Sequence, residues 1–183
     1  MKRVSVDLGN ATRLLHPRPV SIVVTVGRNG EVNGCAVSWI TPVNRDPPII
    51  AFALSPKRFT YKLLRETGEA TINIVGFDDA SKTHYVGSKS GYSVRDKLLK
   101  AGFKLKNSKK VKAPSIENSL ATLECTVEGS IEFPDHDLFI CRVLYAEAVD
   151  YFLADGLPSE NCRVLLHVGS NVYTTSSSYV RVK

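Results

Sequence analysis

The chain alternates short apolar runs with turn-forming residues, a pattern typical of many short β-strands. Residues 20–26 are rich in β-branched side chains and lead into an Asn-Gly turn signal at residues 28–31, which predicts a hairpin. We expect its return strand to continue through Asn33 and Gly34 to residue 40, and residues 41–48, with three prolines, to break the pattern. Residues 49–54 are apolar throughout, which predicts a strand buried on both faces.

A helix is predicted over residues 55–68, with Ser55 as N-cap, Pro56 in the first turn and Gly68 as the C-terminal stop. Further on, the pattern predicts a strand over residues 70–75, a helix over 80–86, a Gly/Ser-rich loop over 87–92 and a helix over 95–101 that stops at Gly102.

The rest of the chain is mainly strand. Residues 121–133 and 139–151 are two long runs separated by the turn at residues 134–137, so we expect them to pair antiparallel, and a shorter pair follows at 165–168 and 172–174. Many strands with few helices predict a mainly β fold, a β-barrel with short helices, because a closed sheet leaves no edge exposed. A chain of 183 residues suits a single domain over residues 1–183.

The composition indicates where in the cell the protein is expected and whether it has a membrane partner. No apolar run approaches the roughly 20 residues that cross a bilayer, and the N-terminus lacks the apolar core of a secretory signal, so we expect a soluble, cytoplasmic protein without a membrane partner. The four cysteines are widely spaced and are expected to stay reduced. Cys125 and Cys141 lie in β-patterned runs, where core packing is the expected role, and packing is also the default for Cys35.

The net charge of +6 raises the question of nucleic-acid binding. Many of the cations collect in residues 97–112, where lysines alternate with apolar residues. Such a segment more often forms a solvated helix and loop than a binding arm, so we expect no nucleic-acid partner.

The predicted helix start at Ser55 carries Lys57 and Arg58 in its first turn, where the helix dipole favours acidic groups. Free backbone N–H groups, the hydroxyls of Ser55 and Thr60 and two cations would together suit a phosphate monoester. An ordinary Ser-Pro cap with solvated cations explains the same residues equally well.

Ser88, Lys89 and Ser90, flanked by Gly87 and Gly91, form a second candidate anion site, because small residues let backbone amides approach a ligand. The segment lacks the glycines of a P-loop, and no Gly-x-Gly-x-x-Gly sequence indicates a Rossmann dinucleotide site. A flexible connector is the alternative.

The four histidines are far apart in the sequence and indicate neither a hydrolytic triad nor a metal site, and we expect no metal. The exception is Asp135-His136-Asp137, where two carboxylates beside an imidazole could hold a metal or tune a proton donor. A polar turn between strands is the commoner explanation.

An ordered series of segments resembles the flavin reductase-like, FMN-binding split-barrel proteins, which include the flavoredoxins. The resemblance extends from about His16 to Tyr173, and each piece is weak alone, but their order and spacing are specific. The segments are His16-Pro17-Arg18-Pro19-Val20, Asn33-Gly34-Cys35-Ala36-Val37-Ser38-Trp39, Asp46-Pro47-Pro48, Ser55-Pro56-Lys57-Arg58-Phe59-Thr60-Tyr61, Glu66-Thr67-Gly68-Glu69-Ala70-Thr71-Ile72-Asn73 and Asp135-His136-Asp137-Leu138-Phe139-Ile140.

The resemblance implies a Greek-key split barrel that forms a homodimer and holds FMN near the subunit interface. It implies that residues 36–39 meet the isoalloxazine ring and that residues around 55–60 and 88–90 hold the ribityl phosphate. It also places His136 close to the flavin and the reductant, as the candidate catalytic residue. The implied cofactor contacts are Ala36, Val37, Ser38, Trp39, Ser55, Lys57, Arg58, Thr60, Ser88, Lys89 and Ser90.

The implied function is a flavin reductase or flavoredoxin that passes hydride from NAD(P)H to FMN, chemistry that needs no side-chain nucleophile. The alternative is a non-enzymatic FMN protein that exchanges electrons with a protein partner. The sequence lacks a nicotinamide-binding fingerprint, which favours the second, whereas His136 favours the first. A nucleic-acid-binding barrel is disfavoured because the basic residues are not interleaved with a stacking platform.

Overall fold

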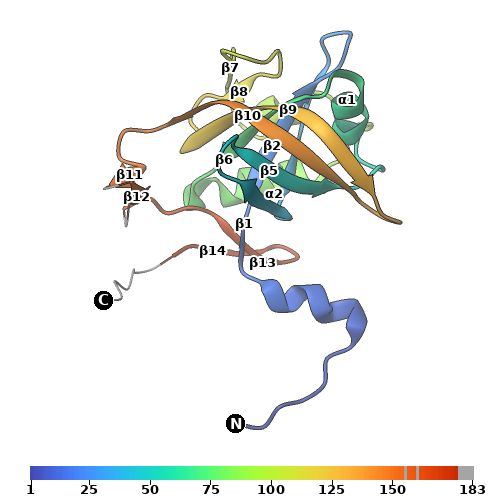
Figure 1. Ribbon diagram of the computed structural model, residues 1–183, viewed down its shortest axis with the longest axis vertical. Coiled ribbons are helices and arrows are strands. Elements are labelled where there is room, and N and C mark those ends of the chain that lie inside the picture. Colours follow the sequence, from blue (N-terminus) through green and yellow to red (C-terminus); the bar gives the residue numbers. More distant parts are fainter. Residues whose placement is uncertain (155, 160, 177–183) are drawn as a thin grey trace.

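The computed structural model, which describes residues 1–154, 156–159 and 161–176, is organised around a seven-stranded antiparallel sheet (Figure 1). In spatial order its strands are β3 (Val32–Val37), β2 (Ser21–Val26), β6 (Glu69–Ile74), β9 (Ala121–Glu132), β10 (Asp137–Ala148), β5 (Ile49–Leu54) and β4 (Ile40–Asn44). The edge strands β3 and β4 are separated along the chain by Ser38 and Trp39 alone. Two residues can join the outermost strands of so wide a sheet only if the sheet rolls up until its two edges lie close together. The predicted mainly β split barrel is therefore confirmed.

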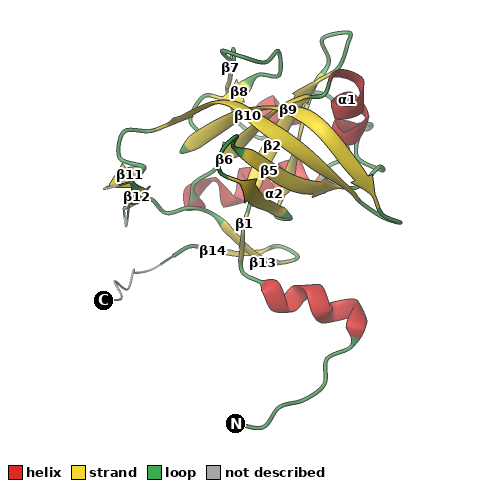
Figure 2. Ribbon diagram, in the orientation of Figure 1, coloured by secondary structure: helices red, strands yellow, loops and turns green. Residues whose placement is uncertain are grey.

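Smaller elements surround the barrel. Figure 2 shows the helices in red, with the first one extending away from the rest of the molecule. The helices are η1 (Leu8–Leu15), α1 (Phe59–Thr67), η2 (Phe77–Asp79), α2 (Ala80–Ser88) and α3 (Lys97–Lys100). The short strands are β1 (Arg18–Pro19), β13 (Leu166–Gly169) and β14 (Val172–Thr174) in one sheet, β7 (Leu105–Lys106) with β8 (Ser115–Ile116), and β11 (Leu153–Ala154) with β12 (Leu157–Pro158). No helix in the described part of the chain is long and apolar enough to cross a membrane.

Most of the predicted strands are confirmed. β2 and β3 form the expected hairpin, with Gly30 in the left-handed conformation that its turn requires (φ 81°). The buried strand β5, the strand β6, β9 and the final pair of β13 and β14 also lie within one residue of the expected positions. β10 pairs antiparallel with β9 as expected, but it begins two residues earlier and ends three residues earlier than predicted.

The prediction that residues 41–48 are irregular is wrong for their first half. β3 ends at Val37, and β4 then pairs with β5 from Ile40 to Asn44 before the chain turns. β4 contains Pro42, which has no N–H to donate. A proline is tolerated there because β4 is an edge strand, with one side free of strand partners.

The helix starts differ from those predicted. α1 begins at Phe59 rather than at Ser55, and its N-cap is Arg58, so the assignment of Ser55 as N-cap is wrong. The extended backbone of Arg58 (ψ 137°) separates the helix from a turn in which the N–H of Arg58 donates to the carbonyl of Ser55 at 3.0 Å. The C-terminal stop at Gly68 is confirmed (φ 69°).

The helix predicted over residues 95–101 is a single turn, α3. Asp96 precedes it in the left-handed conformation (φ 53°), which is incompatible with a helix that begins any earlier. Gly102 ends it as predicted, with φ 88°.

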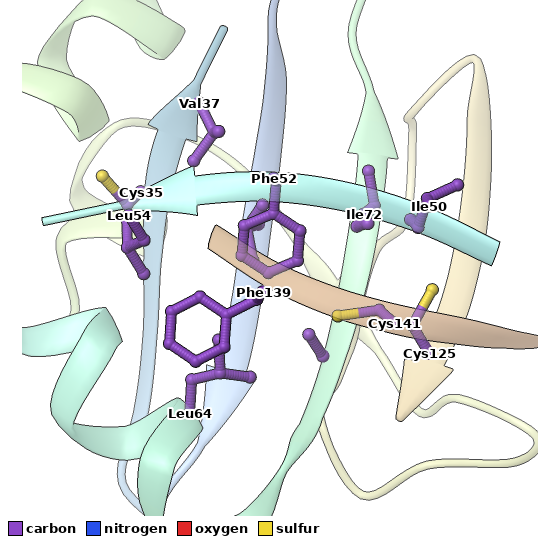
Figure 3. Packing of buried hydrophobic residues seen from close by; sticks show 12 residues of the cluster. Cys35, Val37, Ile50, Phe52, Leu54, Leu64, Ile72, Cys125, Phe139 and Cys141 are labelled. Atoms are coloured by element: carbon purple, nitrogen blue, oxygen red, sulfur yellow. The ribbon is translucent and has the colours of Figure 1, made fainter. Parts of the chain in front are cut away.

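The two larger apolar cores lie on opposite faces of the sheet. Along β2, Val23 belongs to the inner core, whereas Ile22 and Val24 belong to the outer one, as the alternation of side chains along a strand requires. Figure 3 shows the inner core, where the rings of Phe52 and Phe139 stack with centroids 5.7 Å apart. The outer core lies between the sheet and α2, α3 and the segment before β13. Because both faces are covered, all six residues of β2 are buried, including Ser21 and Thr25.

The cysteines are buried free thiols, so the packing role expected for Cys125 and Cys141 is confirmed. Burial raises the pKa of the Cys141 thiol to about 12 and raises the pKa of Cys125 as well. Both thiols therefore stay protonated at neutral pH and are poor nucleophiles. Cys35 also packs in the inner core.

We expect the substitution Phe52→Ala to lower the free energy of unfolding by about 3–5 kcal/mol, because it removes a fully buried ring and leaves a cavity beside Phe139. Urea unfolding followed by circular dichroism measures this. The matched control is Tyr151→Ala at a ring that is 54% exposed, where we expect a change of about 0.5 kcal/mol or less. Similar losses at the two positions would show that the inner core does not carry the stability.

Candidate functional site

Three adjoining cavities meet at Arg58, which lines each of them. We call them the cationic cavity (about 310 Å³), the strand cavity (about 130 Å³) and the histidine cavity (about 320 Å³). Ser55 and His136 are shared by the first two, and Ala36 and Ser38 by the last two. The cavities therefore form one continuous groove.

Every candidate site residue predicted from the sequence lines this groove. The cationic cavity brings together Ser55, Lys57, Arg58, Thr60, Lys89, Ser90 and His136. The strand cavity contains Ala36, Val37, Ser38 and Trp39, and the histidine cavity contains Ser88. These residues come from β3 and the connection after it, the turn and first residues of α1, the end of α2 with the loop after it, and the turn before β10. Only the folded barrel brings these segments together.

The cationic cavity has the chemistry of an anion site. Lys57, Arg58, Lys89 and Lys97 line it, and none of its lining residues is acidic. It also includes the first turn of α1, whose backbone N–H groups have no side-chain cap. Together the positive end of the helix and the four cations favour an anion.

The hydroxyl groups of Thr60 and Ser55 in the cationic cavity differ in their hydrogen bonding. The Thr60 hydroxyl is buried and donates to Asn33 Oδ1 at 2.9 Å, which ties α1 to the start of β3. Its hydrogen is therefore directed into the protein. The Ser55 side chain, by contrast, makes no hydrogen bond in the described part of the chain, so it is free to meet a ligand.

Two glycines allow the end of α2 and the loop after it to approach β3 and α1. A Cβ atom on Gly87 would lie 3.0 Å from the Cβ of Ala36, and one on Gly91 would lie 2.6 Å from Asn33 Nδ2 and 2.8 Å from the Cβ of Phe59. Arg58 spans the gap, since its Nη1 donates to the carbonyl of Gly87 at 3.1 Å. The loop that carries Lys89 and Ser90 is thus held against the start of α1.

The strand cavity presents a free strand edge. It runs along the outer edge of β3, which pairs with β2 on its other side alone, so backbone donors and acceptors on this edge have no strand partner. Trp39 lies at one end with its ring centroid 4.9 Å from that of His136, and the Arg18 guanidinium lies 5.6 Å from the Trp39 ring. Burial lowers the pKa of Arg18.

His136 lies in the turn between β9 and β10, and the carboxylates beside it do not form a metal site with it. Its Nδ1 lies 3.2 Å from Asp135 Oδ1 but outside hydrogen-bond geometry. Asp137 is buried and accepts a hydrogen bond of 2.7 Å from the Tyr61 hydroxyl, which raises the pKa of Tyr61. No cluster of metal-binding side chains occurs in the described ranges.

The histidine cavity contains residues that the sequence analysis did not select. His84 Nδ1 lies 3.3 Å from the Tyr173 hydroxyl, and the His167 ring centroid lies 5.3 Å from that of Tyr173. Burial raises the pKa of Tyr173. These residues come from α2, β13 and β14, and no local signal in the sequence indicates that they meet.

Lys97 is a further residue that the sequence analysis missed. Residues 97–112 were expected to form a solvated helix and loop, but Lys97 is 3% exposed and lines the cationic cavity. Nothing in the sequence around Lys97 distinguishes it from the other lysines of the segment, because its burial follows from the packing of Leu98, on the same one-turn helix, into the outer core. The remaining lysines of the segment, from Lys100 to Lys112, are exposed as expected.

Comparisons with known proteins find a matching family profile and similar sequences. The profile of the flavin reductase like domain matches residues 13–175. An uncharacterized protein of Pyrococcus abyssi is 34% identical over 163 residues, which cover 89% of this chain and 92% of that protein.

Two solved structures resemble the fold closely. Flavoredoxin of Desulfovibrio vulgaris is 26% identical with a TM-score of 0.85, and the alignment covers 98% of this chain and 97% of that one. An FMN-binding protein of Thermus thermophilus, solved with bound 1-cyclohex-2-enone, is also 26% identical with a TM-score of 0.85, and the alignment covers 100% of this chain and 99% of that one.

We expect the substitution Gly91→Ala to lower the free energy of unfolding by about 1–3 kcal/mol, because the added methyl group meets the buried Asn33 side chain and the Phe59 Cβ. Gly129→Ala is the control, since a Cβ there meets nothing within 4 Å. Chemical unfolding of both variants measures the difference. Equal stability of the two would contradict the close approach of this loop.

Proposed function

Because the chain belongs to the flavin reductase-like family, we propose that it binds FMN in the groove around Arg58 and works as a flavin reductase that takes hydride from NAD(P)H. One observation carries the proposal. Four cations and the uncapped start of α1 line a cavity with no acidic residue, at one end of a groove whose other parts suit a planar ring.

The donors of the cationic cavity fit a phosphate monoester. Lys57, Arg58 and Lys89 would supply positive charge, and the hydroxyls of Ser55 and Ser90 would supply neutral donors. A dianionic phosphate would offset the repulsion among these cations. A dinucleotide is a poorer match to this end because the sequence has no Gly-x-Gly-x-x-Gly segment.

The strand cavity supports the ring. The polar edge of an isoalloxazine needs hydrogen-bond donors and acceptors in one plane, and the free edge of β3 at Ala36 to Ser38 presents backbone groups of that kind. When bound, FMN would supply the hydride-accepting chemistry. The protein's part is to hold the phosphate, orient the ring and shield one side with Trp39 and His136.

His136 is proposed to act at the reductant side of the ring. It lines both the strand and the cationic cavities, and its Nδ1 makes no hydrogen bond in the described part of the chain. An imidazole with an unused nitrogen is suited to contact a polar group of a second ligand.

The second candidate is an FMN protein that exchanges electrons with a protein partner. The similarity to the flavoredoxin of Desulfovibrio vulgaris favours it, as does the absence of a nicotinamide-binding fingerprint in the sequence. The homodimer implied by the resemblance and a cytoplasmic location both remain predictions.

The two candidates separate in an anaerobic titration. We expect the purified protein, loaded with FMN, to lose its visible flavin absorption when NADH or NADPH is added. A flavin that neither nucleotide bleaches, but that a reduced ferredoxin does bleach, would select the electron-transfer protein. A protein that retains no FMN would contradict both.

Lys57→Ala and Arg58→Ala are each expected to weaken FMN binding by about 10-fold to 100-fold, the loss of one charge-assisted hydrogen bond. Riboflavin, which lacks the phosphate, should be affected much less. Lys104→Ala removes the same charge from an exposed residue outside the groove and should leave both affinities unchanged. Isothermal titration calorimetry measures all of these affinities. FMN bound at wild-type affinity by the Lys57 and Arg58 double variant would show that the phosphate lies elsewhere.

A further inference from the structure

Lys97 is the single buried cation in the described part of the chain. Its side chain is 3% exposed, whereas the cations around it, Lys57, Arg58 and Lys89, lie at the surface. Removing an ammonium group from water is costly unless an opposite charge lies nearby. The position of Lys97 therefore calls for a counter-charge.

The protein itself supplies carbonyl oxygens but no carboxylate. Lys97 Nζ donates to the carbonyl of Val86 at 2.9 Å and to that of Lys89 at 3.0 Å, which satisfies two of its three N–H groups. No acidic group lies within ion-pair distance of Nζ among the described residues. Burial lowers the pKa of Lys97, the nearby Cys35 thiol acts in the opposite direction, and Arg58 contributes a smaller lowering.

The two buried carboxylates among the described residues are engaged elsewhere. Glu124 accepts hydrogen bonds from the backbone N–H groups of Lys109 and Lys110, and Asp137 accepts one from Tyr61. Glu31, which lines a neighbouring cavity together with Lys97, pairs with Arg95 at 3.1 Å. The remaining N–H group of Lys97 and its charge are thus available to the cationic cavity that Lys97 lines.

We propose that Lys97 is a specificity-determining residue, the buried half of a charge pair whose other half is the phosphate dianion of the flavin, and that it makes the site prefer FMN to riboflavin. This inference rests on the FMN site proposed above. Lys97 also binds the carbonyl of Lys89, so the same ammonium positions the loop that carries Lys89 and Ser90. Charge and loop position are therefore coupled through one side chain.

The test separates the charge of Lys97 from its hydrogen bonds. A glutamine amide retains two N–H donors but carries no charge, so Lys97→Gln removes the charge while keeping hydrogen-bonding capacity. We expect it to weaken FMN binding by about 10-fold to 100-fold and to change riboflavin binding by less than about twofold. Lys97→Met, a second neutral variant, should show the same selective loss, and Lys97→Arg should retain a preference for FMN.

Lys100→Met is the matched control, because Lys100 lies on the same one-turn helix but is exposed. It should leave both affinities unchanged. Calorimetric titration of each variant with FMN and with riboflavin gives the ratio of the two dissociation constants. An unchanged ratio in both neutral variants, or an equal loss for both ligands, would overturn the role of Lys97 and leave it as a structural cap of α2. Wild-type protein that binds neither flavin would overturn the FMN site itself.

Discussion

Repulsion among like charges is the constraint on which the site depends. Lys57, Arg58, Lys89 and Lys97 line one small cavity beside the positive end of α1, and no acidic side chain lines that cavity. A protein that needed only stability would gain by placing acids there, because the dipole favours them at a helix start. The arrangement becomes favourable when an anion is bound, so it is best understood as a cost that the ligand offsets.

The barrel makes this arrangement possible because it brings segments that are distant in the sequence together beside the outer edge of β3. β3 and β4 are sheet edges joined by Ser38 and Trp39, which leaves the outer edge of β3 free beside the start of α1. Gly87 and Gly91 then allow the loop after α2 to approach from the other side. The groove is thus built from strands and helix ends, and these elements and the loop after α2 carry the cations.

Much of the fold and of the site was predictable from the sequence. The β-branched runs, the Asn-Gly pair of the first hairpin and the helix-ending Gly68 each specify local structure. The mainly β barrel follows from them, and Lys57 and Arg58 stand out because they contradict the dipole rule. The start of α1 was not predictable, since a turn at Ser55 and a helix N-cap at Ser55 share the same residue preferences. The burial of Lys97 and the meeting of His84 with Tyr173 depend on tertiary packing, which leaves no mark on neighbouring residues.

The most direct test of the central claim is a crystal structure of the protein with FMN. The account predicts electron density for the phosphate in the cationic cavity, within hydrogen-bond distance of Ser55 and the Arg58 guanidinium, and for the ring along the free edge of β3. A phosphate found at any other place, or a cationic cavity filled by the protein's own side chains, would contradict it.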